Sequence, residues 1–113
     1  MNYISEHYKI IDIVCEIYGT SYRKIITQSK RREYTYPRYT CIHFLRKYTN
    51  LTTTKIGLLL GRGHSAVVIA GKVYEDLLLI DIIKKKHNEI ENRLTVRNIQ
   101  YNTDCLIDEY ENW

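Results

Sequence analysis

The sequence predicts an all-α fold, a compact helical bundle of about six helices. Its apolar residues recur at spacings of three and four in every apolar segment, and no stretch alternates with the period of two that marks a strand. With one proline and five glycines in 113 residues, the chain has few of the turn residues that a β fold needs. This length corresponds to one domain, and a hydrophobic content of 44% suffices for a core.

The first quarter of the chain is expected to form two scaffold helices. Ser5 can cap the first helix and Gly19 can end it. The apolar stripe of this helix consists of Ile10, Ile11, Val14 and either Ile17 or Tyr18. Ser21 can cap a shorter helix that runs to about Gln28.

A basic loop over residues 29–36 (SKRREYTY) comes next. Pro37 fits the first position of the helix that follows the loop, because a residue there needs no N–H for an intrahelical bond. This helix is expected to run to about Thr49, with an apolar face formed by Cys41, Ile42, Leu45 and Tyr48.

Residues 49–72 (TNLTTTKIGLLLGRGHSAVVIAGK) form the stretch around which the chain is organised. Thr52 or Thr53 can cap a helix that Gly61 ends, and a second helix is expected to start near His64 or Ser65. Two helices joined by a short turn that contains glycine form a helix-turn-helix. In this motif the N-terminal end of the second helix enters the DNA major groove.

Beyond this motif the helical register continues to Leu79, and a last helix is expected over about residues 82–94. We therefore divide the chain into a helix-turn-helix domain, residues 1–94, and an acidic, partly apolar C-terminal extension, residues 95–113. The apolar residues of the extension predict that it packs onto the domain or onto a second copy, which would form a homodimer.

Several motifs of this chain resemble those of the C-terminal DNA-binding domain of the bacterial replication initiator DnaA, which has a TrpR-like helix-turn-helix. The similarity extends over about residues 8–94 in the right order. The matching segments are Lys30-Arg31-Arg32-Glu33, Pro37-Arg38, Tyr48-Thr49-Asn50, Ile56-Gly57 and Gly61-Arg62-Gly63-His64-Ser65-Ala66-Val67. The resemblance implies an all-α domain that binds double-stranded DNA.

The charge distribution favours the same partner. The chain carries a net charge of +4, but residues 22–72 hold eleven basic groups and a single acid, Glu33. A cationic excess confined to the helix-turn-helix segment favours a polyanion as partner.

The resemblance also assigns roles to individual residues. The basic loop corresponds to the family's minor-groove arm, and His64 and Ser65 keep the positions that contact base edges. Ala66 could pack against a thymine methyl group, and Lys55 and Arg62 could bind phosphate. The full set of expected DNA-binding residues is Lys30, Arg31, Arg32, Arg38, Thr53, Thr54, Lys55, Arg62, Gly63, His64, Ser65, Ala66 and Lys72.

Several of these residues depart from the family pattern. Gly63 replaces the family's aspartate and cannot accept a hydrogen bond from a base amino group, and Ala66 replaces a threonine. Thr53-Thr54 replaces the leucine-proline pair that opens the first helix, and Lys55 stands where an acid is usual. The family's DNA box is therefore not assumed to be the target.

Sequence motifs for other chemistry are absent. The chain has no Walker-type phosphate loop, no catalytic triad pattern and no histidine pair with metal-ligand spacing. Its three cysteines form no CxxC pair, and no apolar run is long enough to span a membrane. We expect a cytoplasmic protein of a bacterial or phage-infected cell, not an enzyme, with no metal, nucleotide or other cofactor.

Two functions remain open. The first is a stand-alone DNA-binding protein that acts in replication initiation control or transcription regulation and is of phage or mobile-element origin. The alternative is a protein-interaction or structural protein that keeps the fold without reading DNA sequence. The cationic segment favours the first, and the Gly63 and Ala66 departures favour the second.

Overall fold

The computed structural model describes the backbone of residues 2–106 and the side chains of residues 7–95. The described backbone forms six α-helices and contains no strand, which confirms the predicted all-α fold. In chain order they are α1 (Asn2–Tyr18), α2 (Tyr22–Ile25), α3 (Arg32–Tyr48), α4 (Thr53–Leu60), α5 (His64–Leu77) and α6 (Asp81–Leu106).

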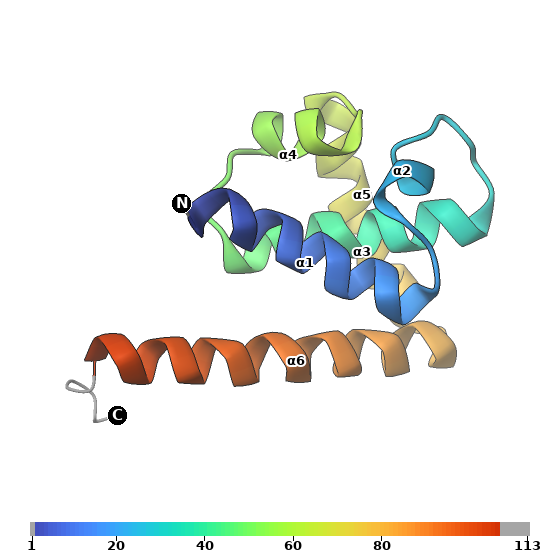
Figure 1. Cartoon of the computed structure of the whole chain (residues 1–113). Helices are drawn as coiled ribbons and strands as arrows, with labels where there is room; N and C mark the ends of the chain where they lie inside the picture. Colours follow the sequence, from blue (N-terminus) through green and yellow to red (C-terminus); the bar gives the residue numbers. More distant parts are fainter. Residues whose placement is uncertain (1, 107–113) are drawn as a thin grey trace.

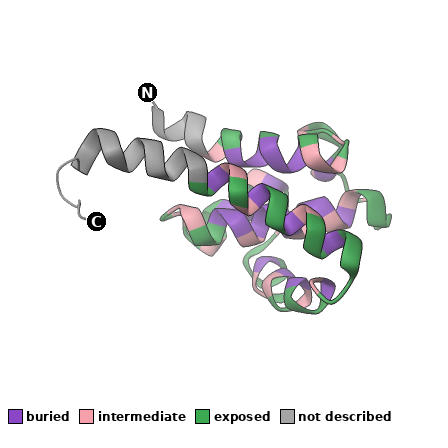
Figure 2. Cartoon of the chain, turned by 90° about the horizontal axis from the view of Figure 1, so that it is seen from below, coloured by how far each residue is buried: buried purple, intermediate pink, exposed green. Residues whose placement is uncertain are grey.

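The helices form two parts on either side of α3 (Figure 1). Helix α6 runs antiparallel to α1 along one side of the bundle, whereas α4 and α5 lie on the other side. Helix α3 contacts α1, α2, α4 and α5 and so joins the two parts. Buried residues follow the inward faces of the helices, and the outward faces are exposed (Figure 2).

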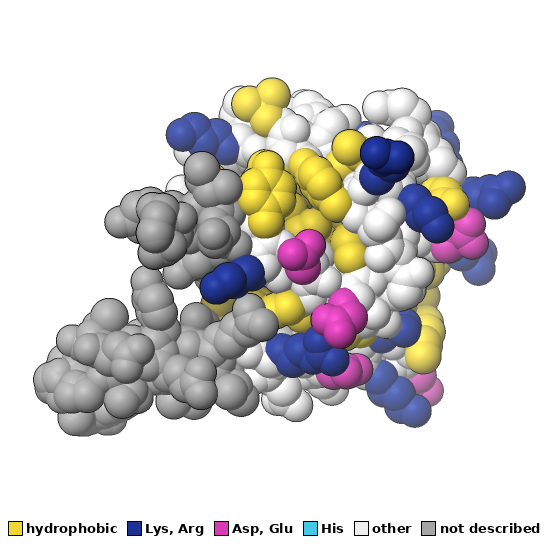
Figure 3. All heavy atoms as spheres, in the orientation of Figure 1, with side chains coloured by type: hydrophobic (Ala, Val, Ile, Leu, Met, Phe, Trp, Pro, Cys, Tyr) yellow, Lys and Arg dark blue, Asp and Glu magenta, His cyan; other side chains and the backbone are white. Residues whose placement is uncertain are grey.

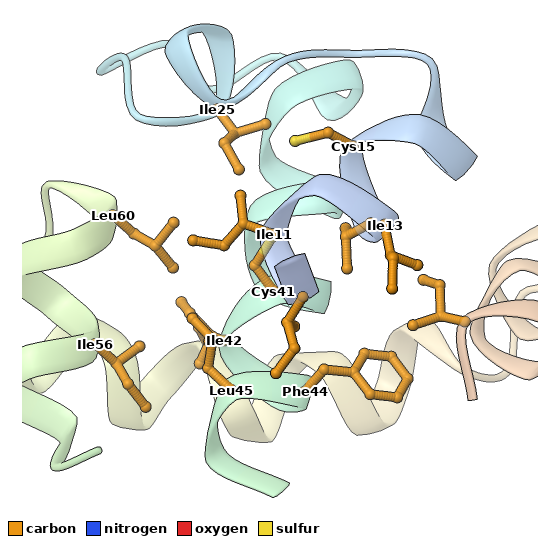
Figure 4. Packing of buried hydrophobic residues seen from close by; sticks show 14 of the residues in the cluster. Ile11, Ile13, Cys15, Ile25, Cys41, Ile42, Phe44, Leu45, Ile56 and Leu60 are labelled. Atoms are coloured by element: carbon orange, nitrogen blue, oxygen red, sulfur yellow. The ribbon is translucent and has the colours of Figure 1, made fainter. Parts of the chain in front are cut away.

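The core lies where these helices meet. Figure 4 shows Ile11 of α1, Ile25 of α2 and Leu60 of α4 pointing toward one another, with Cys41 and Leu45 of α3 beside them. The exposed fraction of each of these side chains is 0%. Burying a side chain of this size contributes about 1.5–3 kcal/mol, so α4 is fixed to the rest of the domain through this core.

Local signals at the helix ends agree with the sequence in three places. The Ser21 hydroxyl accepts a hydrogen bond from the Lys24 N–H, and the Thr52 hydroxyl accepts one from Lys55. Gly61 ends α4 with φ +68°, in the left-handed region that favours glycine. These caps confirm the predicted starts of α2 and α4 and the predicted end of α4.

Other boundaries differ from the prediction. Ser5 lies inside α1 and does not cap it, and α2 ends at Ile25 rather than near Gln28. Helix α3 already begins at Arg32, so Pro37 lies inside it. The N–H groups of Tyr34 and Thr35 both donate to the Arg31 carbonyl and so close the first turn of the helix. Pro37 removes only one backbone hydrogen bond, because it lacks an N–H group.

Helix α6 extends to Leu106 and so crosses the predicted boundary between domain and extension. Residues 107–113 and the side chains of residues 96–106 lie outside the described part, so the predicted packing of the extension and the homodimer stay predictions.

Among the described residues, no single helix is both long and apolar enough to cross a membrane. Helices α4 and α5 together have sufficient apolar length, but the chain bends by 91° between them.

Candidate DNA interface

The turn between α4 and α5 is fixed by close backbone contact. The Arg62 N–H donates a hydrogen bond of 2.7 Å to the Gly57 carbonyl. The Arg62 carbonyl in turn lies so near Gly57 that an added Cβ would be 2.3 Å from its oxygen. Glycine at this position thus lets the chain reverse tightly, and the resulting bend of 91° is typical of a helix-turn-helix.

The turn exposes the N-terminal end of α5. Gly63 is the N-cap residue, with φ −82° and ψ 170° and no side-chain cap bond. His64, Ser65 and Ala66 form the first turn of the helix, and all three are exposed. The unbonded N–H groups of a helix start carry partial positive charge, so this end favours an anion or a hydrogen-bond acceptor.

The His64 ring is held by the first helix of the motif. Thr53 Oγ1 and His64 Nδ1 lie 2.6 Å apart, a hydrogen bond between the first residue of α4 and the first residue of α5. Thr54 and Lys55, the next two residues of α4, are exposed. The motif therefore presents its polar residues at one end.

The outward face of α5 continues with one apolar side chain. Ser65, Ile69 and Lys72 share this face because they follow one another at spacings of four and three. Ile69 is 59% exposed, whereas Val67 and Ala70 on the opposite face are buried. No sequence signal distinguishes Ile69, because a mixed apolar helix does not reveal which aliphatic residue faces outward.

The basic loop begins near the turn between α4 and α5, where the Arg62 guanidinium donates a hydrogen bond to the Thr27 carbonyl. Lys30, Arg31 and Arg32 are exposed, and the Arg31 guanidinium forms an ion pair of 3.4 Å with Glu33. Figure 3 shows Lys and Arg side chains gathered around the connection between α2 and α3.

Arg38 does not lie on the surface that the sequence predicts for it. It is 3% exposed, and its guanidinium donates hydrogen bonds to the carbonyls of Ile25 at 2.6 Å, Thr27 at 3.0 Å and Ser29 at 3.3 Å. Burial and the nearby Arg62 lower the pKa of this guanidinium. Arg38 therefore acts as an internal brace that shapes the start of the basic loop.

Arg62 connects the same loop to the helix-turn-helix. Its guanidinium donates to the Thr27 carbonyl at 2.6 Å and to the Gly61 carbonyl at 2.8 Å. The loop and the turn are thus positioned relative to each other by two arginines that share the Thr27 carbonyl.

A groove of about 510 Å³ lies between α3 and α5, and Arg46 is one of the cations that line it. Its lining residues are His43, Arg46, Lys47, Val68, Gly71, Lys72 and Glu75. Gly71 has no side chain to displace the Arg46 guanidinium, since an added Cβ would lie 2.8 Å from Nη1. Arg46 has no role that the sequence predicts, because its contact with α5 joins residues far apart in the chain.

The fold and this exposed helix end define a helix-turn-helix protein. The particular family follows from comparison with known sequences. The family model of the bacterial dnaA protein helix-turn-helix matches residues 7–73, more than half of the chain. The chain belongs to this family, which confirms the resemblance that the sequence motifs indicate.

Similar full proteins are chromosomal replication initiators. The chain is 30% identical to DnaA 1 of Chlamydia pneumoniae over 87% of its own length and 20% of that protein. It is 31% identical to DnaA of Gloeobacter violaceus over 75% of the chain and 20% of that protein. For DnaA of Lachnoclostridium phytofermentans the identity is 33%, over 70% of the chain and 19% of that protein. The chain thus spans about a fifth of the length of these relatives.

Proposed function

We propose that this protein binds double-stranded DNA with the N-terminal end of α5. The observation that carries the proposal is the exposed start of this helix, where His64 and Ser65 lie and where His64 contacts the first turn of α4, which carries the exposed Lys55. The shape of a helix-turn-helix allows α5 to enter the major groove while α4 crosses the backbone.

The neighbouring residues supply the phosphate contacts. Among the described side chains, the ion pairs involve Arg31 but not Lys30, Arg32, Lys55 or Lys72. Cations without carboxylate partners remain available for phosphate, and Arg46 extends this surface along the groove beside α5. We propose that the basic loop follows the adjacent minor groove, a role that the bracing of its start by Arg38 and Arg62 supports.

The biological role that we propose is control of replication initiation, in the cytoplasm of a bacterial cell. This proposal rests on the relatives, which are chromosomal replication initiators. A role in transcription, stand-alone action and phage or mobile-element origin stay predictions from the sequence.

A salt titration of binding to a random duplex tests DNA binding itself. Each neutralised phosphate releases counterions, so the logarithm of the binding constant should fall by about 0.9 per contact for each tenfold rise in salt. We expect a slope of roughly −4 to −6. No binding at low salt, or binding that salt leaves unchanged, would overturn the proposal.

A pair of variants separates reading of bases from binding of phosphates. His64→Ala should reduce discrimination between sites, by about 1–3 kcal/mol for a good base contact. Lys55→Ala should weaken all sequences alike and lower the salt slope by about one. If both variants weaken all sequences equally, α5 does not read bases.

One structural observation also favours the alternative function, a protein-interaction module. Leu79 is 84% exposed and Ile82 is 55% exposed, and both lie near the junction of α5 and α6. Substituting both residues with serine should leave DNA binding unchanged under our proposal. Loss of a specific protein partner with unchanged, non-selective DNA binding would support the alternative instead.

A further inference from the structure

We infer that Thr53 is a positioning residue that fixes His64 so that its Nε2 atom presents an N–H donor to the major groove. The protein would then select a base with a hydrogen-bond acceptor at this position. The selectivity for bases rests on the proposed function, whereas the state of the histidine ring does not.

The contact that supports this inference joins the two helices of the motif. Thr53 Oγ1 lies 2.6 Å from His64 Nδ1, although the residues are eleven positions apart. Without such a bond, an exposed histidine at a helix start can occupy several side-chain rotamers. A hydrogen bond to one ring nitrogen fixes the ring plane, and it leaves Nε2 as the ring nitrogen available to a ligand.

The neighbours of His64 leave this bond as the main restraint on the ring. Gly63 has no side chain, and the space around it is open, since an added Cβ there would meet no atom within 4 Å. Ala66 carries only a methyl group. Neither residue offers a hydrogen-bonding side chain to the imidazole, so the orientation of His64 depends on α4.

The hydrogen bond fits the tautomer that carries the ring proton on Nε2. A neutral imidazole is more stable with its proton on Nε2, and the Thr53 hydroxyl can then donate to Nδ1. In this tautomer Nε2 carries the hydrogen and donates, whereas the opposite tautomer would make Nε2 an acceptor.

A donor at this position distinguishes bases by their major-groove edges. Guanine presents N7 and O6 as acceptors, adenine presents N7, and thymine presents O4. Cytosine presents only an amino donor there, so it would oppose the Nε2–H group. The expected target therefore has a purine or a thymine, and not a cytosine, at the base that His64 contacts.

The first test examines the ring without DNA. Nitrogen-15 NMR of the labelled full chain should show the neutral His64 ring protonated at Nε2. Thr53→Val keeps the side-chain shape and removes the hydroxyl, so the Nδ1 signal should shift toward that of a solvent-exposed ring. Thr53→Ser should restore the signal, and Thr54→Val should leave it unchanged. A ring protonated at Nδ1, or a spectrum that Thr53→Val does not alter, would overturn the inference.

The second test examines selectivity. A preferred duplex is first selected from random DNA, and each base pair is then replaced in turn. At one position the native protein should lose about fivefold to tenfold in affinity when cytosine replaces the acceptor base. Where that base is a purine, 7-deaza substitution should have a similar effect if N7 is the acceptor. Thr53→Val should lose this discrimination, whereas Thr53→Ser should retain it.

The outcomes separate the two proposals. If the native protein binds no DNA at low salt, the proposed function fails and the base selectivity fails with it, while the NMR result still decides the role of Thr53. If DNA binds with unchanged preference in Thr53→Val, the proposed function stands and the inference is wrong. Thermal unfolding of each variant checks that the fold is kept.

Discussion

Four of the five ion pairs among residues 7–95 involve side chains of α6, whereas around the helix-turn-helix only Arg31 has a carboxylate partner in this part of the chain. On the α6 side, the Glu91 carboxylate accepts from the Tyr48 hydroxyl at 2.9 Å and pairs with Lys47 and His87. Arg93 bridges Glu16 at 3.2 Å and Glu89 at 3.3 Å. Figure 3 shows Lys and Arg side chains close to Asp and Glu side chains over the described part of α6.

The difference indicates which charges hold the fold and which are available to a ligand. Exposed ion pairs contribute roughly 0–1 kcal/mol each, so the α6 side gains a little stability from pairing. The exposed lysines of the other side add repulsion and no such gain. A surface that adds little to stability yet keeps its cations apart from acids is typical of polyanion binding.

The largest expected effect breaks the helix-turn-helix side at its turn. In Gly57→Ala the new methyl group would overlap the Arg62 carbonyl, which lies 2.3 Å from the Cβ position. Overpacking against backbone should lower the free energy of unfolding by about 2–3 kcal/mol, measured by urea denaturation. Gly63→Ala is the matched control, because its Cβ would meet no atom within 4 Å. Equal stability of the two variants would contradict this account of the turn.

The second prediction concerns acid stability on the α6 side. His43 packs against Tyr74, Phe44 and His87, and its Nε2 atom is buried without a hydrogen-bond partner. Burial, with the neighbouring His87 and Lys47 adding to it, lowers the pKa of His43 from 6.5 to about 4. The folded protein therefore resists a proton that the unfolded chain accepts.

The sign follows from this difference. Above about pH 6.5 both states are neutral at His43, so it adds no pH dependence. Between about pH 6.5 and 4 the unfolded state binds the proton, and stability should fall as the pH falls. Since the ring is partly exposed, we expect a loss on the order of 1–2 kcal/mol. Urea denaturation at several pH values should show a flatter profile for His43→Leu. An unchanged slope in this variant would assign the acid sensitivity to other groups.

Which of these features the sequence could predict depends on how far apart the contacting residues lie. Gly61, Thr52 and Ser21 act on their own helix ends, so local rules identified them. The inward turn of Arg38 depends on carbonyls of residues 25–29, and that arrangement exists only in the folded chain. A surface arginine and an internal brace are identical in the sequence.

The candidate site shows the same limit. The family motif placed His64 and Ser65 at the exposed helix start, because that position depends on the turn alone. The Thr53 contact with His64 and the approach of Arg46 to Gly71 join different helices, and neither has a local signal. The prediction that Pro37 begins its helix is wrong for a related reason. The hydrogen bonds to the Arg31 carbonyl already close an earlier turn of α3, so the helix tolerates the one N–H bond that Pro37 cannot make.

The third prediction tests whether the outward face of α5 reads thymine. Ile69 is exposed one turn beyond Ser65 and is placed to contact a thymine methyl group in the major groove. Replacing one thymine of the selected duplex by uracil should lower the affinity by about 0.8 kcal/mol, the value of one buried methyl group. The loss should disappear in Ile69→Ala. Equal losses in both proteins at every thymine would exclude this contact.

The last prediction has the smallest expected effect. It adds a carboxylate to the helix-turn-helix, so that both sides of the molecule carry acids beside their cations. Gly63 has a backbone conformation that other residues adopt, and the space around it is open. In Gly63→Asp the carboxylate can accept a hydrogen bond from a free N–H at the start of α5 and oppose the helix dipole. We expect the free energy of unfolding to rise by about 0.5 kcal/mol.

DNA binding should change in the opposite direction. The new carboxylate repels phosphate, so affinity for random duplex should fall and the salt dependence should weaken. It also adds an acceptor beside His64, so affinity for a site with a base amino group there, such as the initiator family's own box, should rise relative to random DNA. Gly63→Asn is the control, since it can cap the helix without adding charge. If Asp and Asn lower the affinity for random duplex equally, the cap and not the charge controls binding, and the cations around α5 are not the phosphate contacts that we propose.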